Sequence, residues 1–215
     1  MQQSDSVRTT YENLMEKTKQ IVQQKTGKSD PNPTEEQYAV LHLKVEAEGG
    51  RDGAKDLSSA QIGVTRLLAV IAQIVSGWGG TLIEANHQFY TAIFPMSEPD
   101  AASRSCICGL QIIRAIDDVV NPSLIEEGIH LRFQGGVGIS MGQVYGFQTG
   151  LTMPVDSLYY GDAMASAVEY ANMTSGFVIV DKVVKEHFER SDSEFKAEFV
   201  PYRYHEWVGY RFHVN

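Results

Sequence analysis

The segment from Trp78 to Pro95 constrains the fold of this chain most strongly. Gly79-Gly80 is typical of the end of a helix, and the residues after it predict a short strand over 81–85. The alternating side chains of 89–94 predict a second strand with both faces covered, which ends at the proline. A polar pair, Asn86-His87, predicts a tight hairpin turn between the two strands. Hairpin tips commonly carry the chemistry of an enzyme, so this tip is a candidate functional site.

The rest of the chain predicts strands and helices in an α+β order. Before the hairpin we expect a strand over 37–48, a glycine-rich loop over 49–55 and a helix over 57–78. After it, the expected elements are a helix over 97–120, strands over 128–139 and 143–147 joined by a turn at Met141-Gly142, a helix over 161–173, a strand over 177–181, a helix over 182–188, and a closing hairpin of 195–200 and 206–214. This order predicts a mostly antiparallel sheet with helices on one face. The first six elements match a ferredoxin-like βαββαβ core, extended by further strands.

Two local patterns sharpen this prediction. Ser97 and Asp100 resemble a capping box, with Pro99 in the first turn of the helix that follows the hairpin. Three glycines at 135, 136 and 138 indicate a bulge or a close backbone approach in the strand that contains them.

Residues 1–35 are expected to form an N-terminal helix and a proline-containing linker, ahead of a folded domain over 36–215. An a/d pattern of short heptads runs through the helix, at Val7, Tyr11, Leu14, Thr18 and Ile21. A seam of this length is marginal alone in water, so it needs a partner. The helix is either a dimerising stalk or a helix that packs on its own domain, and the sequence leaves both open.

Composition and charge exclude several classes of partner. The 215 residues carry a net charge of −9 without a run of Lys or Arg, so no nucleic-acid partner is expected. No apolar stretch is expected to reach the ~20 residues of a membrane helix, and the polar N-terminus lacks the core of a signal peptide. We therefore expect no membrane partner and a cytoplasmic location. Cys106 and Cys108 are interpreted as small buried hydrophobic residues, since their spacing suits neither a metal site nor a redox pair.

Several short motifs resemble those of one known family. The hairpin, with Gly79-Gly80 and Phe94-Pro95, is similar to the central hairpin of the class III adenylyl and guanylyl cyclase catalytic domains. Further similar motifs follow in the family's order, namely Ala39-Val40-Leu41, Gly138-Ile139-Ser140-Met141-Gly142, Tyr160-Gly161-Asp162, Ala167, Gly176-Phe177-Val178-Ile179-Val180 and Gly209-Tyr210-Arg211-Phe212. The resemblance covers about 37–215 and implies the class III cyclase-like sandwich.

The resemblance also implies a catalytic set, and this chain departs from it throughout. In the family two aspartates hold two metal ions, an asparagine orients the ribose, an arginine stabilises the transition state, and a lysine with an aspartate or cysteine reads the base. The matching residues here are Lys44 and Gln88 for the metal ligands, Ala165 and Glu169 for the asparagine and arginine, and Glu84 and Leu158 for the base-reading pair. A lysine repels a divalent ion, and a glutamate repels the phosphates that an arginine would bind. No catalytic residues are therefore expected.

No metal or cofactor is expected unless the chain is an active cyclase, which would need Mg²⁺ or Mn²⁺. Glu46 and Glu48 are candidate ligands for a displaced metal site, although acidic residues at the end of a strand are more often solvated surface. His42 and His87 lie on neighbouring predicted strands, but two histidines without a third ligand do not define a zinc site.

The leading hypothesis is a catalytically inactive cyclase-like domain that acts as a dimerisation, regulatory or nucleotide-sensing module in intracellular signalling. One alternative is a divergent cyclase, or one half of a heterodimeric site, that makes a cyclic nucleotide from ATP or GTP. A second alternative is a scaffold without a small-molecule ligand. The expected partner is a second copy or another cyclase-like domain, and a nucleotide is the candidate ligand. The resemblance implies pairing through the hairpin and the helix over 161–173, with Met164, Ala167, Val168 and Tyr170 at the interface.

Overall fold

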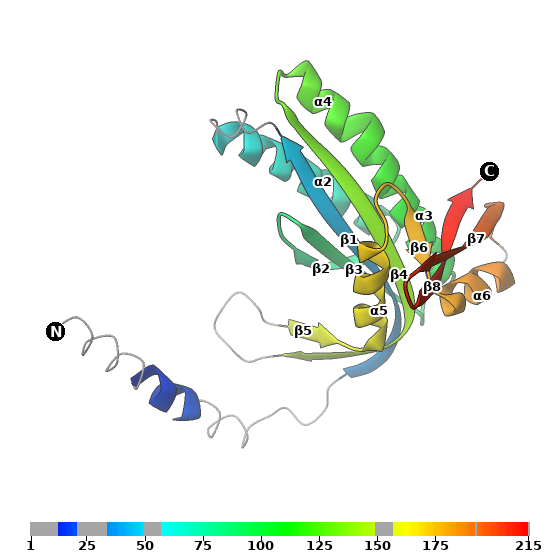
Figure 1. Ribbon diagram of the computed structural model, residues 1–215. Coiled ribbons are helices and arrows are strands. Elements are labelled where there is room, and N and C mark those ends of the chain that lie inside the picture. The colour runs from blue at the N-terminus through cyan, green and yellow to red at the C-terminus, as the bar shows by residue number, and fades with distance from the viewer. Residues whose placement is uncertain (1–12, 21–33, 50–56, 149–156, 192, 215) are drawn as a thin grey trace. The chain divides into compact units, whose positions relative to one another are not determined.

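The computed structural model describes residues 13–20, 34–49, 57–148, 157–191 and 193–214 (Figure 1). The chain divides into two compact units, one of Met1–Thr34 with Phe147–Leu158 and one of Glu35–Gly146 with Tyr159–Asn215. In the first unit, residues 13–20 are helical, as expected, and Leu14 is 58% exposed. Three of the predicted seam residues, Val7, Tyr11 and Ile21, lie outside the described residues.

Within the described residues the sheet has eight strands, and it confirms the ferredoxin-like core. Its strands are β1 (Thr34–Gly49), β2 (Thr81–Ala85), β3 (Phe89–Pro95), β4 (Leu131–Gln148), β5 (Ser157–Tyr160), β6 (Val178–Val180), β7 (Ala197–Tyr204) and β8 (Trp207–Val214). They are ordered β2-β3-β1-β4-β6-β8-β7, with β5 paired to β4. The run β2-β3-β1-β4 is the strand order of a βαββαβ unit, and β6, β7 and β8 are the expected extension.

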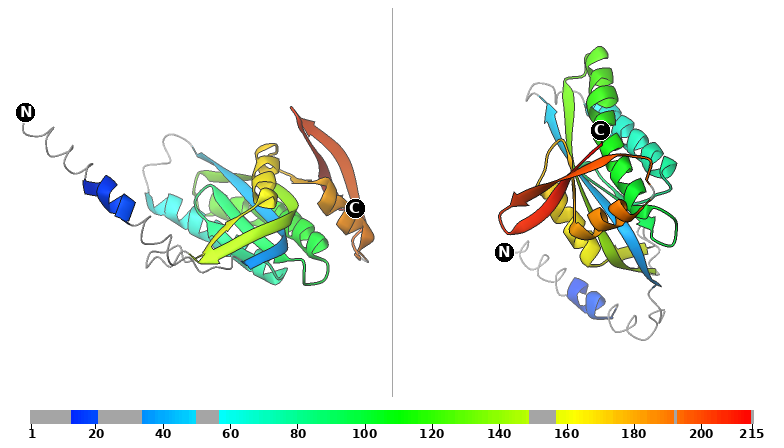
Figure 2. Two further views of the ribbon diagram at one scale, coloured as in Figure 1. Left: turned by 90° about the horizontal axis from the view of Figure 1, so that it is seen from below. Right: turned by 90° about the vertical axis from the view of Figure 1, so that its right-hand side faces the viewer.

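Helices cover both faces of the sheet, and not one face as the sequence predicted (Figure 2). The helices are α2 (Leu57–Gly77), α3 (Ala101–Ala115), a π-helical segment η2 (Ile116–Val120), α4 (Asn121–Glu126), α5 (Asp162–Asn172) and α6 (Lys182–Arg190). All except α5 pack into the main hydrophobic core on one side, here called the core face. Helix α5 packs on the other side, here called the α5 face.

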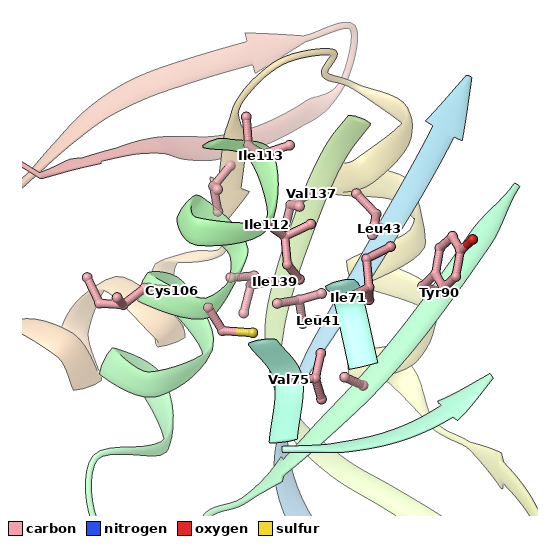
Figure 3. Packing of buried hydrophobic residues seen from close by; sticks show 14 of the residues in the cluster. Leu41, Leu43, Ile71, Val75, Tyr90, Cys106, Ile112, Ile113, Val137 and Ile139 are labelled. Carbon is pink, nitrogen blue, oxygen red and sulfur yellow. The ribbon is translucent and has the colours of Figure 1, made fainter. Parts of the chain in front are cut away.

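The alternation of β1 divides its side chains between these two faces, as predicted. Leu41 and Leu43 point into the core face, where they pack with Ile71 and Val75 of α2 (Figure 3). Val40 points to the α5 face and packs with small residues of α5. Burial of one such aliphatic side chain contributes roughly 1.5–3 kcal/mol, so both faces of β1 stabilise the fold.

The glycines of β4 allow α5 to lie directly against the strand backbone. A Cβ atom at Gly136 would overlap the carbonyl oxygen of Thr174, and one at Gly138 would overlap that of Ala167. The close approach predicted from these glycines is confirmed. The sheet therefore holds α5 without intervening side chains.

Two local predictions about turns and caps were wrong. Helix α3 begins at Ala101 after a left-handed Asp100 (φ 56°), whose side chain makes no capping hydrogen bond, so Ser97 and Pro99 precede the helix. No turn interrupts β4 at Met141, because the strand continues from Leu131 to Gln148. The Met141 amide donates to the Asp181 carboxylate at 3.2 Å, and this bond holds the residue in the extended strand.

The helix expected to end at Val120 continues through a π-helical turn into α4. The buried Asn121 follows this turn and bonds to the backbone of β4. Its Nδ2 donates to the Phe133 carbonyl and its Oδ1 accepts from the Phe133 amide, both at 2.8 Å. The pairing of β4 with β6 begins only at Val137. At Phe133, the Asn121 side chain therefore makes the two backbone hydrogen bonds that a neighbouring strand would otherwise make.

One segment is more apolar than the sequence analysis expected. The 19-residue stretch Ser59–Gly77, within α2, has the length and composition of a membrane-crossing helix, with a mean hydropathy of 1.4 over 18 of its residues. In the structure, Leu67, Ile71 and Val75 of this helix belong to the core. Arg66, on the same helix, forms an ion pair with Glu127 at 2.8 Å.

Candidate functional site

Three side chains form a hydrogen-bonded chain across the α5 face of the hairpin. The strand register pairs His42 of β1 with Thr91 of β3, and Thr91 with Glu84 of β2. His42 Nδ1 lies 2.9 Å from Thr91 Oγ1, which donates to Glu84 Oε2 at 3.0 Å. Because the threonine proton goes to the carboxylate, Nδ1 must carry the proton that the hydroxyl accepts. Nε2 is then an unprotonated acceptor.

His42 is held neutral by its surroundings. It is 4% exposed, and its Nε2 is buried without a hydrogen-bond partner among the described residues. Burial lowers the pKa of His42, and the charge of Glu84 opposes that shift only in part. The Phe89 ring stacks on the imidazole with a centroid distance of 5.6 Å. The site therefore presents a buried neutral imidazole connected to an exposed carboxylate.

Lys44 lies one pleat further along β1 on the same face. Its Nζ makes a 2.8 Å ion pair with Oε1 of Glu46, and the two side chains are 30% and 56% exposed. Glu48, beyond them, is exposed. The lysine is cross-strand partner to Phe89, next to the hairpin tip. A partly buried ammonium therefore occupies the position at which the resemblance implies a metal-binding carboxylate.

Gln88 lies in the hairpin turn, which has three residues rather than the expected two. Asn86 Oδ1 accepts from the amides of Gln88 and Phe89 at 2.9 and 2.8 Å, and the Gln88 carbonyl accepts from the Val45 amide at 2.7 Å. These bonds fix the turn backbone and leave the Gln88 side chain exposed. His87 is also exposed here, so the buried His42 and this histidine do not share one environment.

Helix α5 places its predicted site residues in three different environments. Ala165 and Glu169 are exposed, and Met164 and Val168 are partly buried. Ala167 and Tyr170 are buried by the chain's own sheet, at 0% and 7% exposure. These two therefore offer almost no side-chain surface to a partner, which corrects the interface expected from the sequence.

Leu158 is 43% exposed on β5 and belongs to the first compact unit. The other predicted site residues, from Lys44 to Tyr170, belong to the second unit. The second unit thus contains five of the six positions at which the resemblance implies catalytic groups.

The residues present do not fit a pair of divalent ions. Among the described residues, no group of three or more His, Cys, Asp or Glu side chains is placed to hold a metal ion. At the two implied ligand positions stand an ammonium, already paired with Glu46, and a neutral amide. A hard divalent ion prefers several carboxylate oxygens. The nearest carboxylate, that of Glu46, is already paired with the Lys44 ammonium.

Solved structures similar to this one are nucleotide cyclase domains. The guanylate cyclase domain of RhGC from Catenaria anguillulae, in complex with GTP, matches with a TM-score of 0.64 at 15% identity, over 85% of this chain and 98% of that one. The adenylyl cyclase CyaB from P. aeruginosa matches with a TM-score of 0.65 at 11% identity, over 85% and 96%. The fold is that of a class III nucleotide cyclase catalytic domain. A non-canonical dimeric guanylyl cyclase domain of the RhoGC fusion protein from Blastocladiella emersonii also matches, with a TM-score of 0.62 at 15% identity over 83% and 96%.

At the sequence level the likeness to these cyclases is distant. No family model matches the sequence, and no curated protein matches it. The cyclase fold predicted from short motifs is thus confirmed by the structure alone.

Two residues of the site were not found by sequence reasoning, Thr91 and Phe89. Both are ordinary strand residues, and only the β1–β3 register places them beside His42 and Lys44. The signal that could have found them is the alternation of the second hairpin strand, which puts Phe89 and Thr91 on one face.

Proposed function

We propose that this chain is a catalytically inactive domain of the cyclase fold, which acts as a dimerisation and nucleotide-sensing module in intracellular signalling. One observation carries the proposal. Lys44, paired with Glu46 at 2.8 Å, stands where the resemblance implies the first metal-binding aspartate. A cation at that point opposes the binding of the divalent ion on which cyclase chemistry depends.

The other residues that differ from the implied catalytic set extend this argument to both halves of a composite site. Gln88 is neutral, so the hairpin supplies no carboxylate to a second metal ion. On α5, Glu169 is an exposed anion where an arginine would meet the phosphates, and Ala165 has no polar group to orient a ribose. The chain therefore lacks the groups that either half of a heterodimeric site would contribute, which disfavours the active-cyclase alternative.

The proposed partner is a second copy of the chain. Helix α5 lies against the β4 backbone, its alanines share a buried cluster with Val40 of β1 and Ile93 of β3, and among the described residues of the second unit no other helix packs on this face. The middle of this face is buried at His42 and Thr91, so a partner would contact the partly buried and exposed residues around them, such as Lys44, Phe89 and Glu84. A stable pair buries more than ~1,200 Å², so the dimer should persist at micromolar concentration.

The hydrogen-bonding capacity of Glu84 indicates the chemical class of the proposed ligand. Its carboxylate has acceptor sites beyond the bond from Thr91 and has no proton to donate. Guanine presents two adjacent donors, the N1 imino and N2 amino groups, whereas adenine presents only its amino group on the same edge. The acidic residues Glu84 and Glu169 repel a triphosphate, so the ligand we propose is a guanine nucleotide of low charge, such as cyclic GMP.

The experiment is a calorimetric titration of the purified protein with cyclic GMP, cyclic AMP and GTP, without added metal. We expect the order cyclic GMP, then GTP, then cyclic AMP, and at least a tenfold loss of cyclic GMP affinity in Glu84→Gln, since a carboxylate accepts stronger bonds than an amide. Glu198→Gln on the exposed β7 strand is the matched control. Absence of binding for all three at millimolar concentration would contradict the sensing role and favour a scaffold.

A second measurement tests the dimer independently of any ligand. Light scattering behind size exclusion should give twice the 23.9 kDa chain mass at tens of micromolar. A monomer mass at that concentration would refute self-association.

A further inference from the structure

A small apolar cavity lies on the core face, at the edge of the main hydrophobic core. Its volume is about 210 Å³, and its apolar walls come from four parts of the second unit. These wall residues are Trp78 directly after α2, Ile107 and Leu110 of α3, Phe195 before β7, and Val214 at the end of β8. The hydrogen-bonded side chains of the candidate site lie on the α5 face, so the cavity is a separate feature on the other side of the sheet.

The shape and walls of the cavity suit one aromatic ring. The rings of Trp78 and Phe195 lie edge to face, with their centroids 6.3 Å apart and their planes at 64°. Aromatic side chains pack favourably against a further ring in the same edge-to-face or offset arrangements. A cavity of ~150 Å³ lined by apolar side chains binds benzene. The cavity here, at about 210 Å³, therefore has room for a ring that carries a short substituent.

The two polar side chains that line the cavity present hydrogen-bond donors. Gln111 Oε1 accepts from Trp78 Nε1 at 2.6 Å, which leaves the amide N–H groups of Gln111 for a ligand. Arg114, in the last turn of α3, has five N–H donors and no acceptor. Among the described residues, its guanidinium makes no hydrogen bond or ion pair. A ligand that reaches both side chains must therefore offer acceptor atoms.

Arg114 is also the one charged side chain among the described residues that line the cavity. Further charges lie nearby in the sequence, at Asp117 and Asp118 on η2 and at Glu194 and Lys196 beside Phe195. All four are exposed and none lines the cavity, so solvent screens their effect on a ligand inside it. The charge that a bound ligand meets at short range is positive.

We propose that this cavity binds a small aromatic carboxylate. Its ring would pack on Trp78 and Phe195, and its carboxylate would accept hydrogen bonds from Arg114 and Gln111. Ligand sites in proteins commonly combine apolar walls with a few placed polar groups, and the pairing of a guanidinium with a carboxylate is charge-assisted. The proposal does not depend on the nucleotide or the dimer proposed above, because those use the opposite face of the sheet.

The test is a titration of the ¹⁵N-labelled protein with phenylacetate, read from the indole N–H signals by NMR. The chain has two tryptophans, and Trp207→Phe assigns their signals. Trp207 packs on Tyr170 in a different cluster, so it serves as an internal control. We expect the Trp78 signal to shift with a dissociation constant of about 0.1–1 mM, as for a small ligand with few contacts, while the Trp207 signal stays in place.

Two ligand analogues separate the ring from the charge. Phenylacetamide keeps the ring and a carbonyl acceptor but has no charge, so it should bind more weakly than phenylacetate. Phenylethylamine brings an ammonium group to the donors of Arg114 and Gln111, so it should not shift the Trp78 signal at the same concentrations.

Two variants separate the same contributions on the protein side. Arg114→Gln should weaken phenylacetate about fivefold or more and phenylacetamide less than about twofold, since it removes the charge-assisted bond. Arg203→Gln, exposed at the opposite end of the β7–β8 hairpin from Val214, is its matched control. Phe195→Ala removes a wall and should weaken both ligands about fivefold or more. Tyr204→Ala, a similarly exposed aromatic residue on β7, should change neither affinity.

The outcomes decide the proposal without reference to the proposed function. No shift of the Trp78 signal at 10 mM phenylacetate, or equal shifts of both indole signals, would overturn the site. Equal affinities for phenylacetate and phenylethylamine, or an unchanged phenylacetate affinity in Arg114→Gln, would overturn the assignment of a carboxylate ligand. Because Arg114 and Phe195 are both exposed, neither variant should unfold the protein, and circular dichroism verifies this.

Discussion

Replacing Asn121 by leucine tests how much its two hydrogen bonds to β4 stabilise the part of that strand that precedes the pairing with β6. The side chain is 5% exposed and makes two hydrogen bonds of 2.8 Å to the backbone of Phe133. Leucine has the same number and branching of side-chain heavy atoms, although it is bulkier, and it leaves the Phe133 amide and carbonyl without partners. An unpaired buried polar group costs ~1–3 kcal/mol, so we expect a loss of about 2–5 kcal/mol in the free energy of unfolding.

Urea unfolding followed by circular dichroism measures this loss, and a thermal melt gives a second estimate. For a chain of this size, 1 kcal/mol corresponds to roughly 2–4 °C in Tm, so the melting temperature should fall by about 4–20 °C. Asn172→Leu, at an exposed position on α5, is the matched control and should change the free energy by less than ~0.5 kcal/mol. If Asn121→Leu were as stable as that control, the two bonds to β4 would contribute nothing, and the reasoning would be refuted.

Two further stability predictions concern the α5 face. Because burial lowers the pKa of His42 below its unfolded value, the native state should lose stability as pH falls below about 6.5, and His42→Gln should flatten this dependence between pH 7 and 5. Equal acid sensitivity of both proteins would contradict the assignment of a neutral buried imidazole. Gly138→Ala should destabilise the protein by ~1–3 kcal/mol, since the new methyl group overlaps α5, whereas Gly77→Ala, with nothing within 4 Å, should be neutral or stabilising. Equal urea midpoints for the two alanine variants would exclude the close approach of α5.

The sequence predicted those parts of the fold that depend on local periodicity. The alternation of β1 and β3 predicted their two faces, and the glycines of β4 predicted a close contact whose partner, α5, appeared only in the structure. The turn predicted at Met141-Gly142 failed because a tertiary bond, from the Met141 amide to Asp181, holds the strand extended. The helix expected to stop before Asn121 continued because that side chain bonds to β4.

The candidate site, like the fold, could be predicted from the sequence only in part. The positions at which the resemblance implies catalytic groups, including Lys44 and Gln88, were predicted from the spacing of the motifs in the sequence. The bonds joining His42, Thr91 and Glu84 are not visible there, since they depend on the register of three strands. Burial of Ala167 and Tyr170 also required the structure, because a helix seen alone does not reveal which of its sides packs on a sheet.

The most direct test of the central claim is a cyclase assay on the unmodified protein. The protein is incubated with ATP or GTP and manganese, and the products are separated by chromatography. We predict no cyclic nucleotide above a no-protein control, because Lys44 and Gln88 stand where the resemblance implies the metal ligands, and Ala165 and Glu169 stand where it implies the groups that act on ribose and phosphate. Lys44→Asp alone should also be inactive, since groups of one site act as a unit. Cyclic AMP or cyclic GMP made by the unmodified protein would contradict the account.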